Sequence, residues 1–323
     1  MLKRLIYSLV IISFPLMVYS LNMTNMLLVQ HPDICIDSTI QPIVAEMASL
    51  PIESRNPDWV CAVVINKEGK VVALFDTDST NMHVKQKRQL GNIIEPFTLL
   101  GALLTRKVDR YTTFHIAKGG IKTESHHIQD PYPLDTTFRV RDILAFNSPV
   151  GMYKIYEKAY AGNPSAPHLF NTYMRQLGIE SNVKNMQELL GQSYLNKFRI
   201  SPLHLAWLYH CLAHDILPQE WKSVAPFVRE GLHDVVWHNG FGTASRTAWT
   251  RGAQSDKVRV VGKTGAVQIG PGPKNRILSF CGYFPEESPE YTCLIIVANP
   301  TFPHNAGMDC AVPVRKIAEQ IYR

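Results

Sequence analysis

The sequence predicts an α/β (α+β) fold, in which an antiparallel β-sheet is flanked by helices and joined to a mostly helical subdomain. Strand-like segments gather near both ends of the chain, at Trp59 to Phe75 and at Lys257 to Pro300. Helical periodicity and turns fill the middle, from about Asn92 to Gly240. The 323 residues are 46% hydrophobic, which is enough to bury a large core in one domain with an inserted helical region. We therefore expect one sheet built from the two strand-rich segments, with helices packed on its faces.

The first 20 residues have the pattern of an export segment. Lys3 and Arg4 precede an apolar run from Leu5 to Val18, and Val18 and Ser20 stand at the two positions read before a signal-peptide cut. The run is interrupted by serines and a proline and is short for a spanning helix, which needs about 20 residues. Residues 1–20 are therefore predicted to be a cleaved signal peptide, with an uncleaved membrane anchor as the alternative. In both cases the rest of the chain is exported, and residues 21–54 are expected to be a linker.

The strands and one helix follow from local patterns. Trp59 to Phe75 is predicted to be a β-hairpin, because valine pairs flank the glycine-containing turn Asn66-Lys67-Glu68-Gly69. Ser201 is a natural N-cap and Pro202 a natural first residue for a helix that runs to Ala213. Near the end of the chain, Ile277 to Pro285 and Tyr291 to Pro300 are predicted to be a second strand pair.

The segment Gly91-Asn92-Ile93-Ile94-Glu95-Pro96-Phe97-Thr98 resembles the nucleophile motif of penicillin-binding transpeptidases with its reactive residues replaced. In that family a Ser opens a helix and a Lys follows three residues later. This spacing puts both on one face, where the amine can take the hydroxyl proton as the oxygen attacks a carbonyl. Here the two positions hold Asn92 and Glu95. An amide does not form acyl-enzymes, and a Glu with its usual pKa of about 4.3 is an anion where the family has a cation.

Two further segments resemble the other motifs of the same family. Gly262-Lys263-Thr264-Gly265-Ala266-Val267-Gln268 follows a strand-like run from Lys257 to Val261 and is similar to the intact Lys-Thr-Gly strand motif. The resemblance implies that Lys263 and Thr264 meet the terminal carboxylate of a substrate, and that Gly265 lets a peptide pair as an added strand. Ala145 to Met152 is similar to the Ser-x-Asn segment, with Asn147 in place of the Ser and Pro149 in place of the Asn. Pro149 has no side-chain donor and no amide proton, so a substrate contact is lost there.

The resemblance extends over residues 55–323, which we predict to be one transpeptidase-like domain similar to the monofunctional, class B-like members. It includes the Ser-Pro helix at Ile200 to Ala213, the small-residue segment Gly242-Thr243-Ala244 and a closing helix from Ala311 to Tyr322. Residues 21–54 are too few for the large non-catalytic module that usually precedes the domain, so that module is not expected.

Structural interpretations stand beside the chemical ones. Asn92 is a good N-cap and is expected to cap the helix that the Ser would have opened. Glu95 in the first turn is favoured by the helix dipole. We expect it to form a salt bridge with Lys263 across the cleft, which would plug the site; the alternative is a solvated Glu95.

Composition excludes several classes of function. The net charge of +6 is too diffuse for nucleic acid and modestly favours an anionic wall or membrane surface. The six cysteines have no metal or redox spacing, and most of them are expected to be small buried apolar residues, with a Cys281–Cys293 disulfide as the alternative. His126-His127 with Asp130 invites a metal interpretation, but a solvated loop is favoured, since adjacent residues seldom bind one ion well. No cofactor or metal is expected.

Three functions remain. The leading one is an exported, periplasmic or cell-envelope pseudoenzyme that acts as a scaffold or regulator and binds proteins of peptidoglycan synthesis or cell division, with inner-membrane association if the anchor is retained. Removal of a nucleophile costs on the order of 10⁶ in turnover in a comparable enzyme, so catalysis is not expected. The second is a module that binds the peptidoglycan stem peptide through Lys263 and Thr264. The third is an active but divergent D,D-transpeptidase that uses another serine such as Ser148, which lacks a Lys three residues later.

Overall fold

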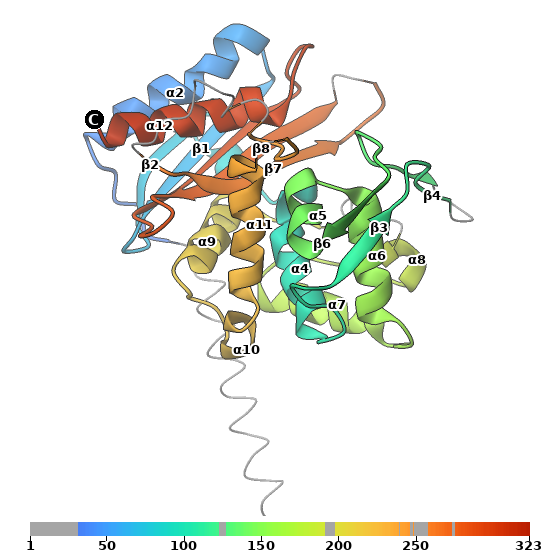
Figure 1. Cartoon of the computed structure of the whole chain (residues 1–323). Helices are drawn as coiled ribbons and strands as arrows, with labels where there is room; N and C mark the ends of the chain where they lie inside the picture. Colours follow the sequence, from blue (N-terminus) through green and yellow to red (C-terminus); the bar gives the residue numbers. More distant parts are fainter. Residues whose placement is uncertain are drawn as a thin grey trace, which may run out of the picture.

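A five-stranded antiparallel sheet runs through the computed structural model, which describes residues 32–122, 127–190, 198–238, 240–245, 248, 258–272 and 275–323. The strands lie in the order β2-β1-β9-β8-β7, so the first hairpin joins the three C-terminal strands through the pairing of β1 with β9 (Figure 1). The predicted fold class is confirmed. The strands are β1 Trp59–Asn66, β2 Val71–Asp76, β7 Val261–Gln268, β8 Arg276–Phe284 and β9 Tyr291–Ala298.

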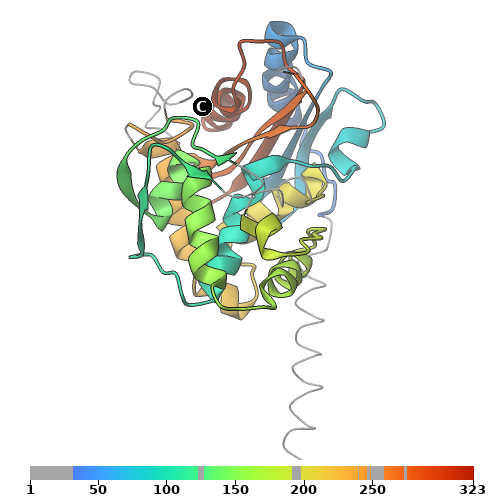
Figure 2. The ribbon, with the colours of Figure 1, turned by 90° about the vertical axis from the view of Figure 1, so that its right-hand side faces the viewer.

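Successive side chains of β1 alternate between two hydrophobic cores, which lie on opposite faces of the sheet. Cys61 and Val63 pack into the larger core beneath the sheet, while Val60, Ala62 and Val64 pack into the smaller one on the opposite face. Successive side chains of a strand point to opposite faces, so a strand buried on both sides is apolar at every position. Figure 2 shows the consequence, with α2 and α12 on one side of the sheet and the helical subdomain on the other.

Helix α2 (Ile40–Arg55) belongs to this packed structure. Its Val44 and Ala48 are fully buried and lie in the smaller core with residues of α12 (Val312–Ile321). Residues 40–54, which the sequence analysis assigned to a linker, therefore form most of a helix on the sheet. The sequence analysis missed this helix because its buried face is defined by contacts with the sheet, which come from residues distant in the sequence.

The helical subdomain is inserted between β2 and β7. It carries two short two-stranded sheets, β3–β6 and β4–β5, beside its helices. The remaining elements in chain order are α3 Met82–Lys85, η1 Gly91–Ile94, α4 Glu95–Leu104, β3 Thr113–Ile116, β4 Ile121–Lys122, β5 His127–Ile128, β6 Thr136–Arg139, α5 Val140–Phe146, α6 Pro149–Tyr160, α7 Ala166–Gln176, α8 Met186–Leu190, α9 Pro202–Ala213, α10 Gln219–Lys222 and α11 Ala225–Trp237, with η3 Gly307–Ala311 before α12.

Several local predictions are confirmed. Ser201 accepts a hydrogen bond from the His204 N–H at the start of α9, and Pro202 is the first residue of that helix. The closing helix α12 ends at Ile321, close to the expected end. The Lys-Thr-Gly segment does not follow a strand but forms one, because β7 begins at Val261; Lys257 lies outside the described residues.

The cysteines behave as small apolar residues. All six are free thiols, and five of them are buried, Cys35 alone being exposed. Cys281 is paired with Leu294 and Cys293 with Gly282, so the two cysteines are not opposite one another and form no disulfide.

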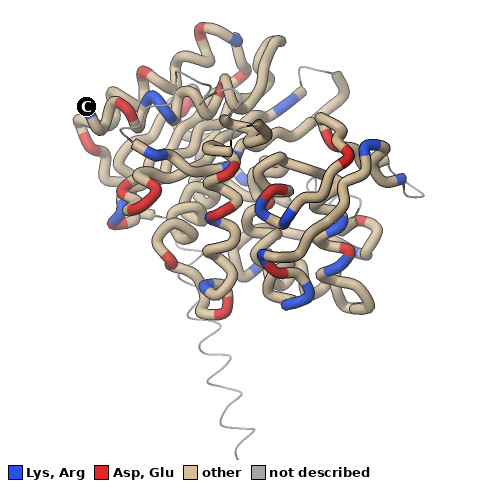
Figure 3. Tube along the Cα trace, viewed as in Figure 1, with Lys and Arg blue, Asp and Glu red and all other residues tan. Residues whose placement is uncertain are grey.

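The distribution of surface charge and the predicted N-terminal segment are the remaining features to compare with the sequence analysis. In Figure 3, lysines and arginines are interspersed with acidic residues and do not form one stripe. No helix among the described residues is long and apolar enough to cross a membrane. The predicted signal or anchor at residues 1–20 lies outside the described part of the chain.

Candidate functional site

The candidate site lies where η1 meets β7, at one edge of the main sheet. Gly91 has a left-handed φ of 69°, and a Cβ there would lie 2.4 Å from the Ala266 carbonyl oxygen. A Cβ on Gly265 would lie 2.5 Å from both Ile93 Cβ and Ser279 Oγ. The two glycines therefore allow η1 to pack directly on β7. The space beside Gly265 is thus filled by Ile93 of the same chain.

Asn92 bridges the two sides of this contact. Its Oδ1 accepts a hydrogen bond from the Ala266 N–H at 2.7 Å, and its Nδ2 donates to Asn147 Oδ1 at 2.5 Å. The expectation that Asn92 caps a helix is wrong, because α4 begins after Ile94 and the Asn92 side chain makes no capping hydrogen bond. A turn of η1 separates Asn92 from α4, so its amide is free to reach across the cleft.

The hydrogen bond to Ala266 occupies an edge of the sheet. Among the described strands, β7 is last in the order and pairs only with β8, so its other side is a row of backbone groups that could pair with an added strand. The Ala266 N–H points to that outer side, as its bond to Asn92 shows. Within this chain, the Asn92 amide occupies the place of one peptide group of such a strand.

Two hydrogen-bond donors of the site share one acceptor, the side-chain oxygen of Asn147. It ends α5 in the left-handed conformation, with φ 59° and ψ 55°, which Asn tolerates better than most residues. Its Oδ1 accepts from Asn92 Nδ2 and from Lys263 Nζ, the latter at 2.6 Å. A carbonyl oxygen has two lone pairs, so both bonds can form together.

Lys263 and Glu95 form the predicted ion pair, 3.6 Å apart from Nζ to Oε2. Both side chains are buried, with exposures of 0% and 4%, so the solvated alternative for Glu95 is wrong. Burial raises the pKa of the Glu95 carboxyl and lowers the pKa of the Lys263 amine, and the charge of each partner opposes these shifts. Nζ also donates to the Thr264 carbonyl oxygen at 2.9 Å. We call Asn92, Glu95, Asn147, Lys263 and the Ala266 N–H the central network.

Pro149 and Ser148 serve the start of α6. Pro149 is its first residue. An amide proton there would have no partner within the helix, so its absence costs no intrahelical hydrogen bond. Ser148 is fully buried; its Oγ accepts from the Gly151 N–H at 2.9 Å and donates to Asp130 Oδ2 at 2.7 Å. The Ser148 hydroxyl therefore caps α6 and hydrogen-bonds to the buried Asp130 carboxylate.

Asp130 is a structural residue and not part of a solvated loop. It is 5% exposed and also accepts from the Val150 N–H at 3.0 Å, and burial raises the pKa of its carboxyl. His127 is exposed and its Nε2 bonds to the Gly119 carbonyl at 3.0 Å, while His126 lies outside the described residues. Among the described residues, no three ligating side chains are placed to hold a metal ion.

A cavity of about 220 Å³ adjoins the central network. Thr243 Oγ1 and Thr264 Oγ1 are 2.7 Å apart and bond to each other at its wall, beside Asn147. The Lys263 side chain has no exposed surface, so a ligand would instead meet polar groups of the cavity lining, among them the two threonine hydroxyls and the Asn147 amide. The cavity is lined by Pro131, Tyr132, Phe146, Asn147, Thr243, Thr264, Asn305, Ala306 and Gly307.

Two supports of the site were not recognised in the sequence. Tyr209 of α9 is buried and its hydroxyl donates to the Ile93 carbonyl at 2.8 Å, which holds η1 from below. Thr243 was used only as a landmark for the small-residue segment. An isolated Tyr or Thr carries no positional signal in one sequence, so neither could have been singled out.

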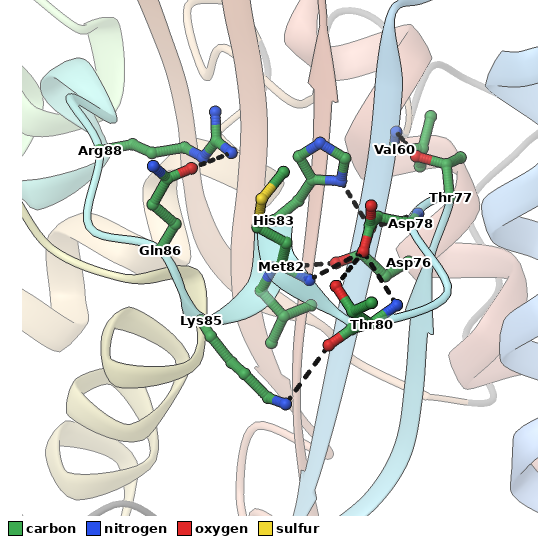
Figure 4. Close-up of polar contacts among 11 residues, drawn as sticks. Val60, Asp76, Thr77, Asp78, Thr80, Met82, His83, Lys85, Gln86 and Arg88 are labelled. Carbon is green, nitrogen blue, oxygen red and sulfur yellow. Dashed lines mark hydrogen bonds and ion pairs between the residues drawn. The ribbon is translucent and has the colours of Figure 1, made fainter.

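The segment that leads into η1 is fixed by Asp76 (Figure 4). Its buried carboxylate accepts from His83 Nδ1 at 2.7 Å and from the Val84 N–H at 3.0 Å. Trp59 stacks on His83 with ring centroids 4.7 Å apart, and the Arg88 guanidinium lies 4.7 Å from the centroid of the Trp59 ring. These contacts tie residues 82–88 to the end of the hairpin and so limit where Asn92 can lie.

Comparison with known proteins agrees with this architecture. The family model for the penicillin binding protein transpeptidase domain matches residues 60–322. A peptidoglycan D,D-transpeptidase FtsI homolog from Mesostigma viride is 22% identical over 303 residues, covering 72% of this chain and 49% of the relative. The chain thus spans about half the length of that curated relative.

Two solved structures share the fold. The apo transpeptidase domain of Burkholderia pseudomallei penicillin-binding protein 3 has a TM-score of 0.74 and 22% identity, covering 88% of this chain and 94% of its own. A structure described as a peptidoglycan glycosyltransferase from Burkholderia ambifaria has a TM-score of 0.72 and 21% identity, covering 88% and 95%. With the family model matching most of the chain, these findings show that this protein belongs to the penicillin binding protein transpeptidase domain family.

Proposed function

We propose that this protein is an exported, non-catalytic member of its family that acts as a scaffold or regulator in peptidoglycan synthesis or cell division. The observation that carries the proposal is the position of Asn92, which stands where the family has its nucleophile. Its side-chain amide is hydrogen-bonded to Asn147 and to the Ala266 N–H. An amide in that place provides no attacking oxygen. Glu95, in the place of the catalytic Lys, is a buried partner of Lys263 and cannot serve as an amine base.

The same geometry argues against catalysis by Ser148. Its hydroxyl is fully buried and hydrogen-bonded to Asp130, and no lysine amine contacts it within the described part of the chain. A serine nucleophile needs a base within hydrogen-bond reach and access to a carbonyl carbon. The divergent-enzyme alternative therefore has no supporting geometry at this serine.

The test is acylation by a fluorescent penicillin, read by gel fluorescence and by intact mass, beside an active transpeptidase as the positive control. We expect no adduct on this protein. An adduct, located by peptide mapping, would overturn the proposal and identify the reacting side chain. The double variant Asn92→Ser/Glu95→Lys is the matched restoration control; it is expected to regain at most weak acylation, because Asn147 and Pro149 still lack the usual groups at their positions.

A stem-peptide binder is the second candidate, favoured by the cavity beside Thr264 and Thr243. Their hydroxyls and the Asn147 amide could meet a terminal carboxylate without covalent chemistry. Against this function, Asn92 already occupies the Ala266 N–H at the edge of β7. Sedimentation with purified wall fragments decides between the candidates, with Thr264→Val as the variant because it removes only the hydroxyl from the cavity wall. Retention that is lost in Thr264→Val would support the binder, and equal behaviour of the two proteins would exclude it.

A further inference from the structure

A buried amine contacts a side-chain amide in the central network. Lys263 Nζ lies 2.6 Å from Asn147 Oδ1, and the Lys263 side chain has no exposed surface. A carbonyl bond is about 1.2 Å long, so the amine nitrogen lies within about 4 Å of the Asn147 side-chain carbonyl carbon. Atoms held about 3–3.5 Å apart in a fixed geometry are close to the arrangement from which they react. The contact therefore places a nucleophilic nitrogen beside an amide carbon.

Two neighbouring groups are placed to assist a reaction between the amine and the amide. Asn92 Nδ2 donates a hydrogen bond to Asn147 Oδ1 at 2.5 Å, and this oxygen becomes negative when its carbon is attacked. Glu95 Oε2 lies 3.6 Å from Lys263 Nζ and has no hydrogen-bond partner within the described residues, so it can accept a proton. Burial raises the pKa of Glu95 and lowers the pKa of Lys263. Both shifts favour proton transfer from the amine to the carboxylate, which frees the nitrogen lone pair.

We propose that Lys263 and Asn147 react slowly in the folded protein and form an intramolecular isopeptide bond between β7 and the end of α5. Lys263 first gives a proton to Glu95, and a small rotation of its side chain then turns the neutral amine onto the Asn147 carbonyl carbon. The new C–N bond forms, the bond from this carbon to Nδ2 breaks, and ammonia leaves. Of the three ammonium protons, one stays on the new amide, one departs with ammonia and one remains on Glu95. No oxidant or other reactant is needed, and ammonia can leave through the cavity of about 220 Å³ beside Asn147.

The bond links the helical subdomain covalently to the main sheet. It joins residues 116 positions apart, and a cross-link over such a distance restricts the unfolded chain in the way that a disulfide does. Freshly purified protein holds the ion pair, whereas reacted molecules hold the bond beside a neutral, buried Glu95. This self-modification goes beyond the proposed scaffold function, because it depends on no partner and no substrate.

The test is intact mass spectrometry of the full chain, sampled over days in native buffer and, as a matched control, in guanidinium chloride, where the geometry of the site is lost. In native buffer we expect a fraction that grows with time to lose the mass of one ammonia molecule, and no loss in the denaturant. Protease digestion and fragmentation should then identify a branched peptide that joins Asn147 to Lys263, a result that needs no variant. Native samples that keep their full mass would overturn the proposal.

Variants separate this bond from other losses of ammonia, with circular dichroism to check that each is folded. Glu95→Gln keeps the shape of the side chain but cannot take up the proton, and it should slow the mass loss by about a hundredfold or more. Lys263→Met should abolish the loss, whereas Lys67→Met, which changes an exposed lysine of the β1–β2 turn, should react like the parent. Ammonia loss at the parental rate in Lys263→Met would assign it to succinimide formation at Asn147 and overturn the bond. A parental rate in Glu95→Gln would overturn the proton transfer.

Discussion

Replacement of Lys263 by Met tests whether the buried ion pair holds the central network together. Two unit charges 3.6 Å apart attract by about 5 kcal/mol at an effective dielectric constant of about 20. Desolvation of the two ions opposes this attraction, but removal of one partner leaves the other charge buried and unpaired, which typically costs about 3–5 kcal/mol. Glu95 Oε2 has no hydrogen-bond donor within the described residues, so nothing there replaces the lysine. We expect the free energy of unfolding to fall by about 3–5 kcal/mol, which at about 2–4 °C per kcal/mol lowers the Tm by roughly 6–20 °C.

Urea unfolding of a double-mutant cycle measures the coupling. The set is the parent protein, Lys263→Met, Glu95→Leu and the double variant, each followed by circular dichroism. The double variant should be less destabilised than the sum of the single variants, because it leaves no charge unpaired in the core. A loss below about 1 kcal/mol in Lys263→Met, together with additive losses in the double variant, would refute the reasoning.

The dependence on pH provides an independent check of the same pair. The folded-state pKa of Glu95 is raised by burial, while the Lys263 charge opposes the rise. Without Lys263 the pKa of Glu95 rises further, and the folded state then binds a proton that the unfolded state, with a pKa near 4.3, does not. A group whose folded pKa is raised gains stability as the pH falls through that value. The difference in stability between the parent and Lys263→Met should therefore narrow as the pH is lowered from about 8 to about 5, and a gap that widens would contradict this assignment.

Three further predictions concern other buried groups. Ser148→Ala should destabilise the protein by about 1–3 kcal/mol in urea unfolding, because α6 loses its cap and Asp130 loses a donor; a change within about 0.5 kcal/mol would argue against this role. Ellman's reagent should label one thiol, Cys35, in the native protein and six after unfolding, and a second fast-reacting thiol would contradict the burial. Because the pKa of His210 is about 3 in the folded protein and about 6.5 when unfolded, the unfolded state takes up the proton first, and stability is lost as the pH falls from about 6.5 toward 3. His210→Gln should remove that part of the acid sensitivity, seen as a shallower fall of Tm with pH than in the parent.

Local patterns were sufficient for the main elements of the fold. The valine pairs around Gly69 formed the expected hairpin, and Ser201 with Pro202 opened α9 as the capping preferences predicted. Each of these signals depends on residues within a few positions of one another. Helix α2 was missed for the opposite reason, since its buried face is defined by contact with strands and with α12, far along the chain.

The candidate site was predicted in part. The motif resemblance placed Asn92, Asn147 and Lys263 at one cleft, and the structure joins them through the shared Asn147 oxygen. The sequence suggested that Gly265 leaves room for a peptide, whereas Ile93 fills that space. It also suggested that Lys263 faces a substrate, whereas its side chain is fully buried in this structure.

The sequence by itself determined the family, the strand and helix order and the identity of the residues at the three motifs, because these are properties of the chain read in order. Only the tertiary structure decided what Asn92 does. Its partners Asn147 and Ala266 lie 55 and 174 positions away, and no periodicity or propensity specifies a hydrogen bond across such separations. That bond depends on how closely η1 packs on β7, and the closeness is set by two glycines and by Tyr209 of α9 acting together.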